Sequence, residues 1–264
     1  MIEEAHQQGI KVHAWFEFGF SYGYKDTSSS WFKRYPAWLG RNNKGELLQK
    51  NGFYWWNALH PGPQRLMREL VLEVVKQYEI DGVQGDDRLP AMPAEGGFDA
   101  YTASLYKSDK KLNLPFDNPK DEAFLQWKAD KLSLFCKSLY DAVKHQRPAC
   151  IVSWAPSIYP WSKEQYLQDW PAWLKGGYAD FVIPQLYRYK LADYEKILKE
   201  LSNQVPPNML KKVYPGILTS LGDGYQASPD MMKQMISLNR KYGFEGEVFF
   251  YYETLNKVPS FKID

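Results

Sequence analysis

The sequence predicts an α/β fold, and within that class a TIM-type (β/α) barrel of parallel strands. Short apolar runs alternate with longer segments whose apolar residues recur at helical spacing. The short runs are almost continuously apolar, which is typical of parallel strands buried on both faces. The segments that follow strands are long (19–60, 86–120, 154–161 and 219–227), as in barrels whose sites lie at the carboxyl ends of the strands. A doubly wound sheet is the alternative, but no glycine-rich phosphate turn follows any strand.

The helices and strands follow one another in pairs. Helix 1–9, which Gly9 ends, precedes strand 12–18. Helix 62–78 begins among prolines, carries Leu66, Leu70 and Val74 at helical spacing, and leads into the short buried strand 82–85. The same periodicity and apolar runs predict helix 121–146 with strand 150–154, helix 162–176 with strand 181–186, helix 191–202 with strand 213–218, and helix 228–242 with strand 247–251. Pro184 lies inside a predicted strand, where it indicates irregular pairing.

Six recognisable strands are two fewer than the eight that close a barrel of this type. The sequence also opens in the middle of a helical pattern, at MIEEAHQQG. We therefore expect a barrel that is incomplete on its N-terminal side, in a chain truncated by two β/α units. No internal repeat, linker or low-complexity tract divides the sequence, so residues 1–264 are predicted to form a single domain.

Composition excludes several classes of protein. The 33 basic and 31 acidic residues leave a net charge of +2, and no basic stripe that would bind nucleic acid is visible. Hydrophobic residues make up 44% and charged residues 24%, as in folded globular chains. No apolar run approaches the roughly 18 residues of a membrane span. Aromatic residues reach 16%, with 10 Trp and 19 Tyr, and indicate a cleft that stacks on flat ligands or sugar rings.

The sequence offers no signature of a metal site or an organic cofactor. Its four histidines are scattered, and neither they nor the two cysteines stand at metal-binding spacing. We therefore expect a reaction that needs no cofactor. The N-terminal residues lack the pattern of a signal peptide. A periplasmic or cell-surface location would depend on a signal upstream of Met1, so localisation stays open, as does the oligomeric state.

Two adjacent carboxylates, Asp86 and Asp87, follow the buried strand 82–85. Glycosidic hydrolysis needs one carboxyl as proton donor and a second as nucleophile or base, in surroundings that separate their pKa values. Because adjacent residues leaving a strand point to opposite sides, we expect one aspartate to face the opening and to act with a carboxylate from another strand. The alternative interpretation is that the pair caps a loop or binds a nearby arginine, Arg88.

Glu17 and Glu253 are the candidate partners. Glu17 closes the first strand, on the same side as His13 and Trp15, and Glu253 follows the last strand. Glu253 is the preferred candidate because Tyr251 leads straight to it at the rim. An ion pair with a lysine or arginine is the other interpretation of Glu17.

The predicted substrate contacts are amides, phenols and aromatic rings at strand ends. Gln185 and Tyr187 are two residues apart and share a face, from which they would bind sugar hydroxyls. The alternative for Gln185 and Tyr187 is a polar layer inside the barrel. His13 is a further candidate contact, and its alternative is a core histidine whose hydrogen bonds are satisfied. The other expected sugar contacts are rings that would stack on the substrate, namely Trp15, Trp154 and Tyr251.

Taken together, these residues resemble the glycosyl hydrolase-like 10 family, a bacterial group of (β/α)8-barrel proteins. The resemblance covers essentially the whole chain and rests on five blocks in order: 5–18 (AHQQGIKVHAWFEF), 56–61 (WNALHP), 81–87 (DGVQGDD), 168–185 (QDWPAWLKGGYADFVIPQ) with Tyr187, and 246–255. The family's region begins with two further strands and their helices. The resemblance implies a site at Asp86 and Asp87. In the family an aromatic tract follows the second aspartate, whereas Arg88-Leu89-Pro90 stands here.

The function these observations predict is that of a glycosidase. We expect a glycoside hydrolase domain that acts on a polysaccharide or cell-envelope glycan by carboxylate acid/base catalysis. One alternative is a non-catalytic carbohydrate-binding barrel, in which the aspartates only bind hydroxyls. The other is an inactive fragment that lacks its first two strands.

Overall fold

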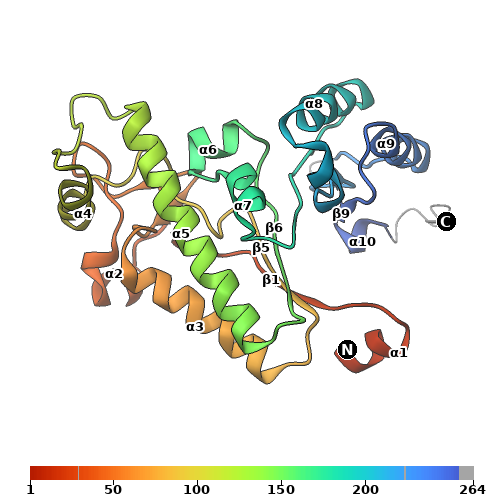
Figure 1. Ribbon diagram of the computed structural model, residues 1–264, viewed down its shortest axis with the longest axis horizontal. Helices are drawn as coiled ribbons and strands as arrows, with labels where there is room; N and C mark the ends of the chain where they lie inside the picture. Colours follow the sequence, from red (N-terminus) through yellow and green to blue (C-terminus); the bar gives the residue numbers. More distant parts are fainter. Residues whose placement is uncertain (29, 223, 256–264) are drawn as a thin grey trace.

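The computed structural model describes residues 1–28, 30–222 and 224–255. At its centre lie six parallel strands, in the order in which they occur in the chain (Figure 1). They are β1 (His13–Phe16), β5 (Gly82–Gly85), β6 (Ile151–Trp154), β7 (Phe181–Val182), β8 (Gly216–Leu218) and β9 (Val248–Phe250). The six strands expected from the sequence are therefore confirmed, as is the TIM-type α/β fold.

The strand ladder is regular at one end of the sheet and irregular at the other. His13 pairs with Gly82, and Gly82 pairs with Ile151, in parallel register. Strand β7 joins β8 through isolated bridges, Val182 with Val213 and Gln185 with Gly216. Pro184 and Pro215 lie in this region, and because proline has no N–H to donate, these strands are shorter than predicted. Within the described residues, β1 and β9 each pair along one edge.

Helices cover the outside of the strands. Helix α3 (Pro61–Gln77) packs against α5 (Glu122–Gln146), and α8 (Leu191–Gln204) packs against α9 (Pro229–Lys241) (Figure 1). Helix α3 starts on prolines, and the ring of its N-cap residue His60 accepts a hydrogen bond from Gly62 N–H. Helix α1 (Ile2–Gln7) and helix α10 (Tyr252–Leu255) are short and lie near the chain ends. No helix in the described residues is both long and apolar enough to span a membrane.

The segments between strands hold more structure than the sequence predicted. Residues 19–60 contain an antiparallel sheet in the order β2 (Ser21–Tyr24), β4 (Phe53–Trp55), β3 (Gln49–Lys50), with α2 (Ser30–Arg34) and the 3-10 helix η1 (Pro36–Trp38). Residues 86–120 contain α4 (Ala100–Lys110), and a second 3-10 helix, η2 (Pro207–Lys212), precedes β8. The single helix expected over 162–176 is two helices, α6 (Trp161–Tyr166) and α7 (Trp170–Gly176). Leu167 has a left-handed backbone (φ 62°), which ends the first of them.

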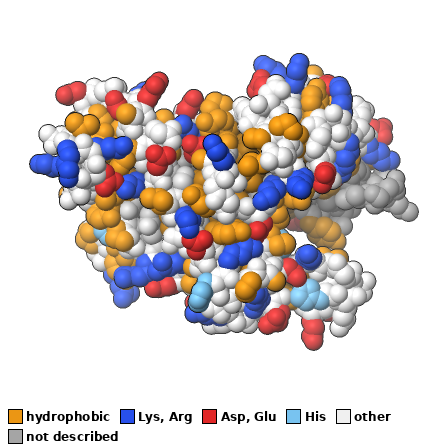
Figure 2. Space-filling model, in the orientation of Figure 1, with side chains coloured by type: hydrophobic (Ala, Val, Ile, Leu, Met, Phe, Trp, Pro, Cys, Tyr) orange, Lys and Arg blue, Asp and Glu red, His pale blue; other side chains and the backbone are white. Residues whose placement is uncertain are grey.

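One hydrophobic core joins these parts. Strand residues such as Val83, Val152 and Trp154 are buried against helix residues, and Phe20 and Trp55 extend the same core into the antiparallel sheet. The face seen in Figure 2 carries acidic and basic side chains interspersed around patches of hydrophobic ones.

Candidate active site

The carboxyl end of β5 carries the two aspartates. Asp86 N–H donates to Phe16 C=O at 3.2 Å, which continues the ladder one residue beyond the strand. Alternation along the strand then puts Gln84 and Asp86 on the inner face and Val83 on the outer, core-packed face. Gly85 is also on the outer face, where a Cβ atom would lie 2.7 Å from the Trp154 ring. The tight packing behind the strand thus requires a glycine just before the acidic pair.

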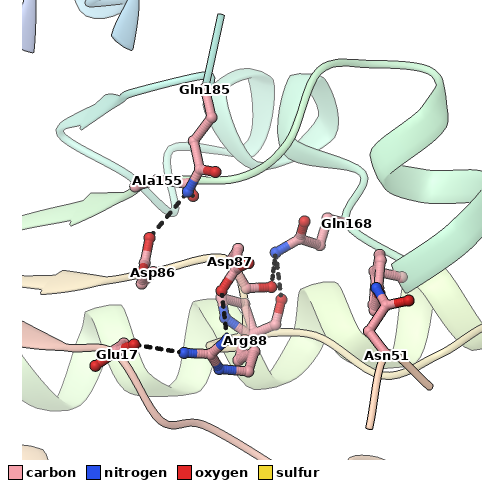
Figure 3. A network of polar contacts seen from close by, with 10 residues as sticks. Glu17, Asn51, Asp86, Asp87, Arg88, Ala155, Gln168 and Gln185 are labelled. Atoms are coloured by element: carbon pink, nitrogen blue, oxygen red, sulfur yellow. Dashed lines mark hydrogen bonds and ion pairs between the residues drawn. The ribbon is translucent and has the colours of Figure 1, made fainter. Parts of the chain in front are cut away.

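Asp86 is held by an amide from the segment after β7, two strands away in the sheet. Gln185 Nε2 donates to Asp86 Oδ1 at 3.0 Å and to Ala155 C=O at 3.0 Å (Figure 3). Burial, and next the negative charge of Asp87, raise the pKa of Asp86 to about 7. A carboxyl with that pKa is still partly protonated at neutral pH, so it can act as an acid.

Asp87 lies on the other side of the chain and in different surroundings. Gln168 Nε2 donates to the backbone carbonyls of Asp87 and Pro90, at 3.1 and 3.2 Å (Figure 3). Burial raises the pKa of the Asp87 carboxyl, whereas the positive charge of Arg88 opposes that rise. Asp87 and Arg88 also line a cavity of about 100 Å³, whose wall is largely aromatic and includes Phe53, Trp161 and Tyr166.

The two predicted partner carboxylates, Glu17 and Glu253, differ in how they relate to the aspartates. Glu17 Oε1 accepts a hydrogen bond from Arg88 Nη2 at 2.8 Å (Figure 3). This is the ion pair that the alternative interpretation expected, although the Glu17 side chain is 44% exposed rather than buried. Glu253 is exposed in the first turn of α10, and the charges that shift the pKa of Asp86 come from Asp87, Arg88 and Glu17. Of the two candidates, the structure brings Glu17 to the aspartates.

An aromatic cluster lies beside Asp86. The ring of Phe250 stacks with Tyr187 at 5.5 Å and contacts Trp15 at 6.3 Å and Tyr251 at 5.2 Å. Burial, together with the neighbouring carboxyls of Asp86 and Asp87, raises the pKa of Tyr187 well above its ordinary value. Trp15 is 48% exposed and Tyr251 38% exposed. The rings of three predicted contact residues therefore meet around one phenylalanine near the carboxyl pair.

Two predicted contact residues lie elsewhere. His13 pairs with Gly82 at the amino end of the strands, and its ring lies 6.2 Å from that of Phe181. Burial lowers its pKa, as for the core histidine of the alternative interpretation. Trp154 is buried on the helix side of β6, where its Nε1 donates to the Tyr178 carbonyl at 3.0 Å. Strand alternation explains this: Val152 and Trp154 share the outer face.

Two residues of the site, Gln168 and Phe250, had no assigned role in the sequence, and Arg88 was named only as the possible ion-pair partner of the aspartates, a contact that the structure contains. Gln168 orients the backbone around Asp87, Arg88 joins Asp87 to Glu17, and Phe250 centres the aromatic cluster. Gln168 stood in a block that carries the family resemblance, and Arg88 stood where the resemblance fails. The resemblance thus drew attention to both positions, but it did not show which groups Gln168 and Arg88 contact. The described residues contain no cluster of His, Cys, Asp and Glu that would hold a metal ion.

Comparison with known proteins decides the family. The sequence profile of the glycosyl hydrolase-like 10 family matches residues 1–234. The chain belongs to this family. Among curated relatives, it is 23% identical to glycosyl hydrolase DigH of Escherichia coli K12, over 97% of this chain and 64% of that protein. It is 22% identical to glycosyl hydrolase YngK of Bacillus subtilis 168, over 98% of this chain and 53% of that protein. The chain thus spans between about half and two thirds of the length of these relatives.

Solved structures show the same fold. The glycoside hydrolase domain of PgaB (BpsB) from Bordetella bronchiseptica superposes with a TM-score of 0.75 at 15% identity, over 97% of this chain and 74% of that chain. Alpha-L-fucosidase isoenzyme 2 from Paenibacillus thiaminolyticus follows with a TM-score of 0.59 at 17% identity, over 94% of this chain and 35% of that chain. This member of the glycosyl hydrolase-like 10 family therefore has the TIM-type fold of glycoside hydrolases.

Proposed function

We propose that this chain is a glycosidase domain that cleaves glycosidic bonds of a polysaccharide or cell-envelope glycan. The observation that carries the proposal is the pair of adjacent carboxyls, Asp86 and Asp87, in different surroundings: Gln185 binds Asp86, whereas Arg88 faces Asp87. Such a division between two carboxyls is what acid/base cleavage of a glycosidic bond requires. Membership of a glycosyl hydrolase-like family and the names of the relatives support the same reaction class.

Asp86 is the proton donor in this proposal. Its pKa of about 7 leaves a large fraction of it protonated near neutral pH, and Gln185 Nε2, at 3.0 Å, orients the carboxyl. It would donate its proton to the glycosidic oxygen as the bond breaks, since an alcohol leaves far more readily than an alkoxide. Asp87, whose rise in pKa Arg88 opposes, is the charged partner here, in place of the carboxylate from another strand that the sequence led us to expect. It would stabilise the developing positive charge or activate the nucleophile. Glu17, which is paired with Arg88, and Glu253, which is exposed, are less suitable for this role.

The aromatic cluster supplies the sugar-binding surface. Trp15 and Tyr251 are exposed beside the half-buried Tyr187, so their faces are available to stack on sugar rings. The raised pKa keeps the Tyr187 hydroxyl protonated at neutral pH, and it can donate a hydrogen bond to the substrate or to Asp86. Gln185 has its amide nitrogen occupied, which leaves its carbonyl oxygen to accept from a sugar hydroxyl.

The substitution Asp86→Asn tests the assignment. The variant keeps the shape and loses the proton, so we expect turnover to fall by about 10²–10⁴-fold while glycan affinity stays the same. The assay measures new reducing ends after incubation with a panel of purified polysaccharides and cell-wall glycans. Asp117→Asn, at an exposed position, is the matched control and should retain full activity.

Two results would count against the proposal. Full turnover in the Asp86→Asn variant would remove this residue from the chemistry. A parent protein that binds glycans of the panel without releasing reducing ends would favour the non-catalytic carbohydrate-binding barrel instead.

A further inference from the structure

Arg88 lies between the two acidic side chains nearest to Asp86. We propose that Arg88 is a positioning residue that keeps the Asp87 carboxylate charged beside the protonated Asp86, and that Glu17 anchors Arg88 in this position. The inference rests on the proposed function only for the chemical use of Asp87. The charge state of Asp87 is a property of the folded chain and can be measured without a substrate.

The Arg88 side chain is held on several sides. Its Nη2 lies 2.8 Å from Glu17 Oε1, and its Nη1 lies 3.6 Å from Asp87 Oδ1 (Figure 3). The guanidinium also packs over the rings of Phe53 at 4.6 Å and Phe18 at 5.3 Å. Only 14% of the side chain is exposed. Three different segments of the chain therefore fix the positive charge at one point.

The backbone around Arg88 is fixed as well. Phe20 N–H donates to the Arg88 carbonyl at 3.3 Å. A Cβ atom on Gly19 would lie 1.8 Å from that carbonyl oxygen, so the close approach of the two loops requires glycine. Gln168 holds the carbonyl of Asp87 on the opposite side. The loop after β1 and the loop after β5 are thus in fixed contact. The contacts of both loops determine where Arg88 lies relative to Asp87.

The charges around Asp87 explain why an arginine is needed there. The titratable groups that face Asp87 are Asp86 and Arg88 from its own loop, Glu17 from the end of β1, Tyr166 from α6 and Tyr187 from the end of β7. Lys50 of β3 lies over the Tyr166 ring, but it is paired with Glu95. Among these groups, Arg88 is the cation that lowers the pKa of Asp87. Without it, burial and Glu17 would both favour protonation of Asp87, and the two aspartates would lose their division of roles.

The contact is electrostatic rather than a hydrogen bond. In the part of the chain that the structure describes, neither Asp87 Oδ1 nor Arg88 Nε has a hydrogen-bond partner. Arg88 therefore stabilises the negative charge without binding the carboxylate tightly. The Asp87 side chain is 40% exposed, so a substrate can reach it from the open side.

The experiment follows the titration of Asp87 by NMR in protein labelled with ¹³C at the aspartate carboxyl carbons. The Asp87 resonance is assigned by its loss in an Asp87→Asn variant. In Arg88→Gln we expect the pKa of Asp87 to rise above the wild-type value, and in Arg88→Lys, which keeps a positive charge, to return towards it. In Glu17→Gln the amide oxygen still accepts from Arg88 while the negative charge is gone, so we expect the pKa of Asp87 to fall.

Arg240→Gln is the matched control. Arg240 forms an ion pair with Glu247 at 2.9 Å, and its loss should leave the Asp87 titration unchanged. A wild-type titration curve for Asp87 in Arg88→Gln would overturn the proposal, as would an unchanged value in Glu17→Gln. If Arg88→Gln proves unfolded by circular dichroism, the conservative Arg88→Lys and the exposed Glu17→Gln still decide. The titration needs no substrate, so it can support the role of Arg88 even if the protein cleaves no glycan. Failure of this proposal and failure of the proposed function are therefore separate outcomes.

Discussion

At the scale of single residues, two chemically identical side chains next to each other in sequence differ because of what surrounds them. Asp86 turns inward to an amide and to aromatic rings, and Asp87 turns to an arginine and lines a small cavity with Trp161 and Tyr166. Desolvation disfavours the charged form of both aspartates. For Asp87, the positive charge of Arg88 opposes this effect. Because the two carboxyls interact, protonation of one depends on the other.

This coupling predicts a pH dependence. The reaction requires protonated Asp86, whose pKa is about 7, so kcat should fall as pH rises through that value. The rate falls rather than rises with pH because deprotonation of Asp86 removes the proton donor. A pH profile of kcat on the glycan that the panel identifies measures it. A rate that stays constant from pH 6 to about 9 would show that Asp86 does not donate the proton.

At the scale of elements, the long segments after strands are folded units pinned by buried polar side chains. Asn57, directly after β4, is fully buried. Its Nδ2 donates to Asp99 Oδ2 and Thr102 Oγ1, each at 2.9 Å, and its Oδ1 accepts from Leu59 N–H at 2.9 Å. Asp99 is also the N-cap of α4. One amide therefore ties the antiparallel sheet to a helix far along the chain.

Asn57→Ala should destabilise the protein markedly. The substitution removes one hydrogen bond each from Asp99 and Thr102, which still bind each other, and leaves the Leu59 N–H without its partner. We expect the free energy of unfolding to fall by about 1–3 kcal/mol. Urea denaturation followed by circular dichroism measures the change. Asn203→Ala, at an exposed position of α8, should change it by less than about 0.5 kcal/mol. Equal stability of both variants would mean that this hydrogen-bond network does not hold the two elements together.

At the scale of the whole molecule, the described strands form one parallel series and their outer faces share one core. That core runs from Phe20 in the antiparallel sheet to Phe244 just before β9. The last two strands join the others only through isolated bridges, but helix residues such as Tyr194 and Met235 belong to the same buried cluster. Packing therefore adds to the few backbone hydrogen bonds that join this end of the sheet to the other strands.

We therefore expect a single cooperative unfolding transition. Far-UV circular dichroism, which reports helices throughout the chain, and tryptophan fluorescence should give coincident curves in urea. Two separated transitions would indicate that β8, β9 and α9 unfold independently. Such a result would also favour the view of the chain as a fragment without a complete core.

Much of the fold was predictable because it depends on local pattern. Apolar periodicity located all six parallel strands and the long helices, and Pro184 marked the irregular strand. The antiparallel sheet in 19–60 was missed because its short strands are stabilised by burial of Phe20 and Trp55 rather than by their own alternation. Trp154 was predicted to contact substrate because its position at a strand end was clear, whereas the face it occupies depends on register.

The sequence by itself determined the fold class, the family and the strand end at which the acidic pair stands, because these follow from periodicity and from residue types close together in the chain. Only the tertiary structure decided that Gln185 binds Asp86 and that Arg88 bridges Glu17 and Asp87. Those contacts join residues from different strand ends. The distances and burial that set their charges exist only once the strands lie side by side.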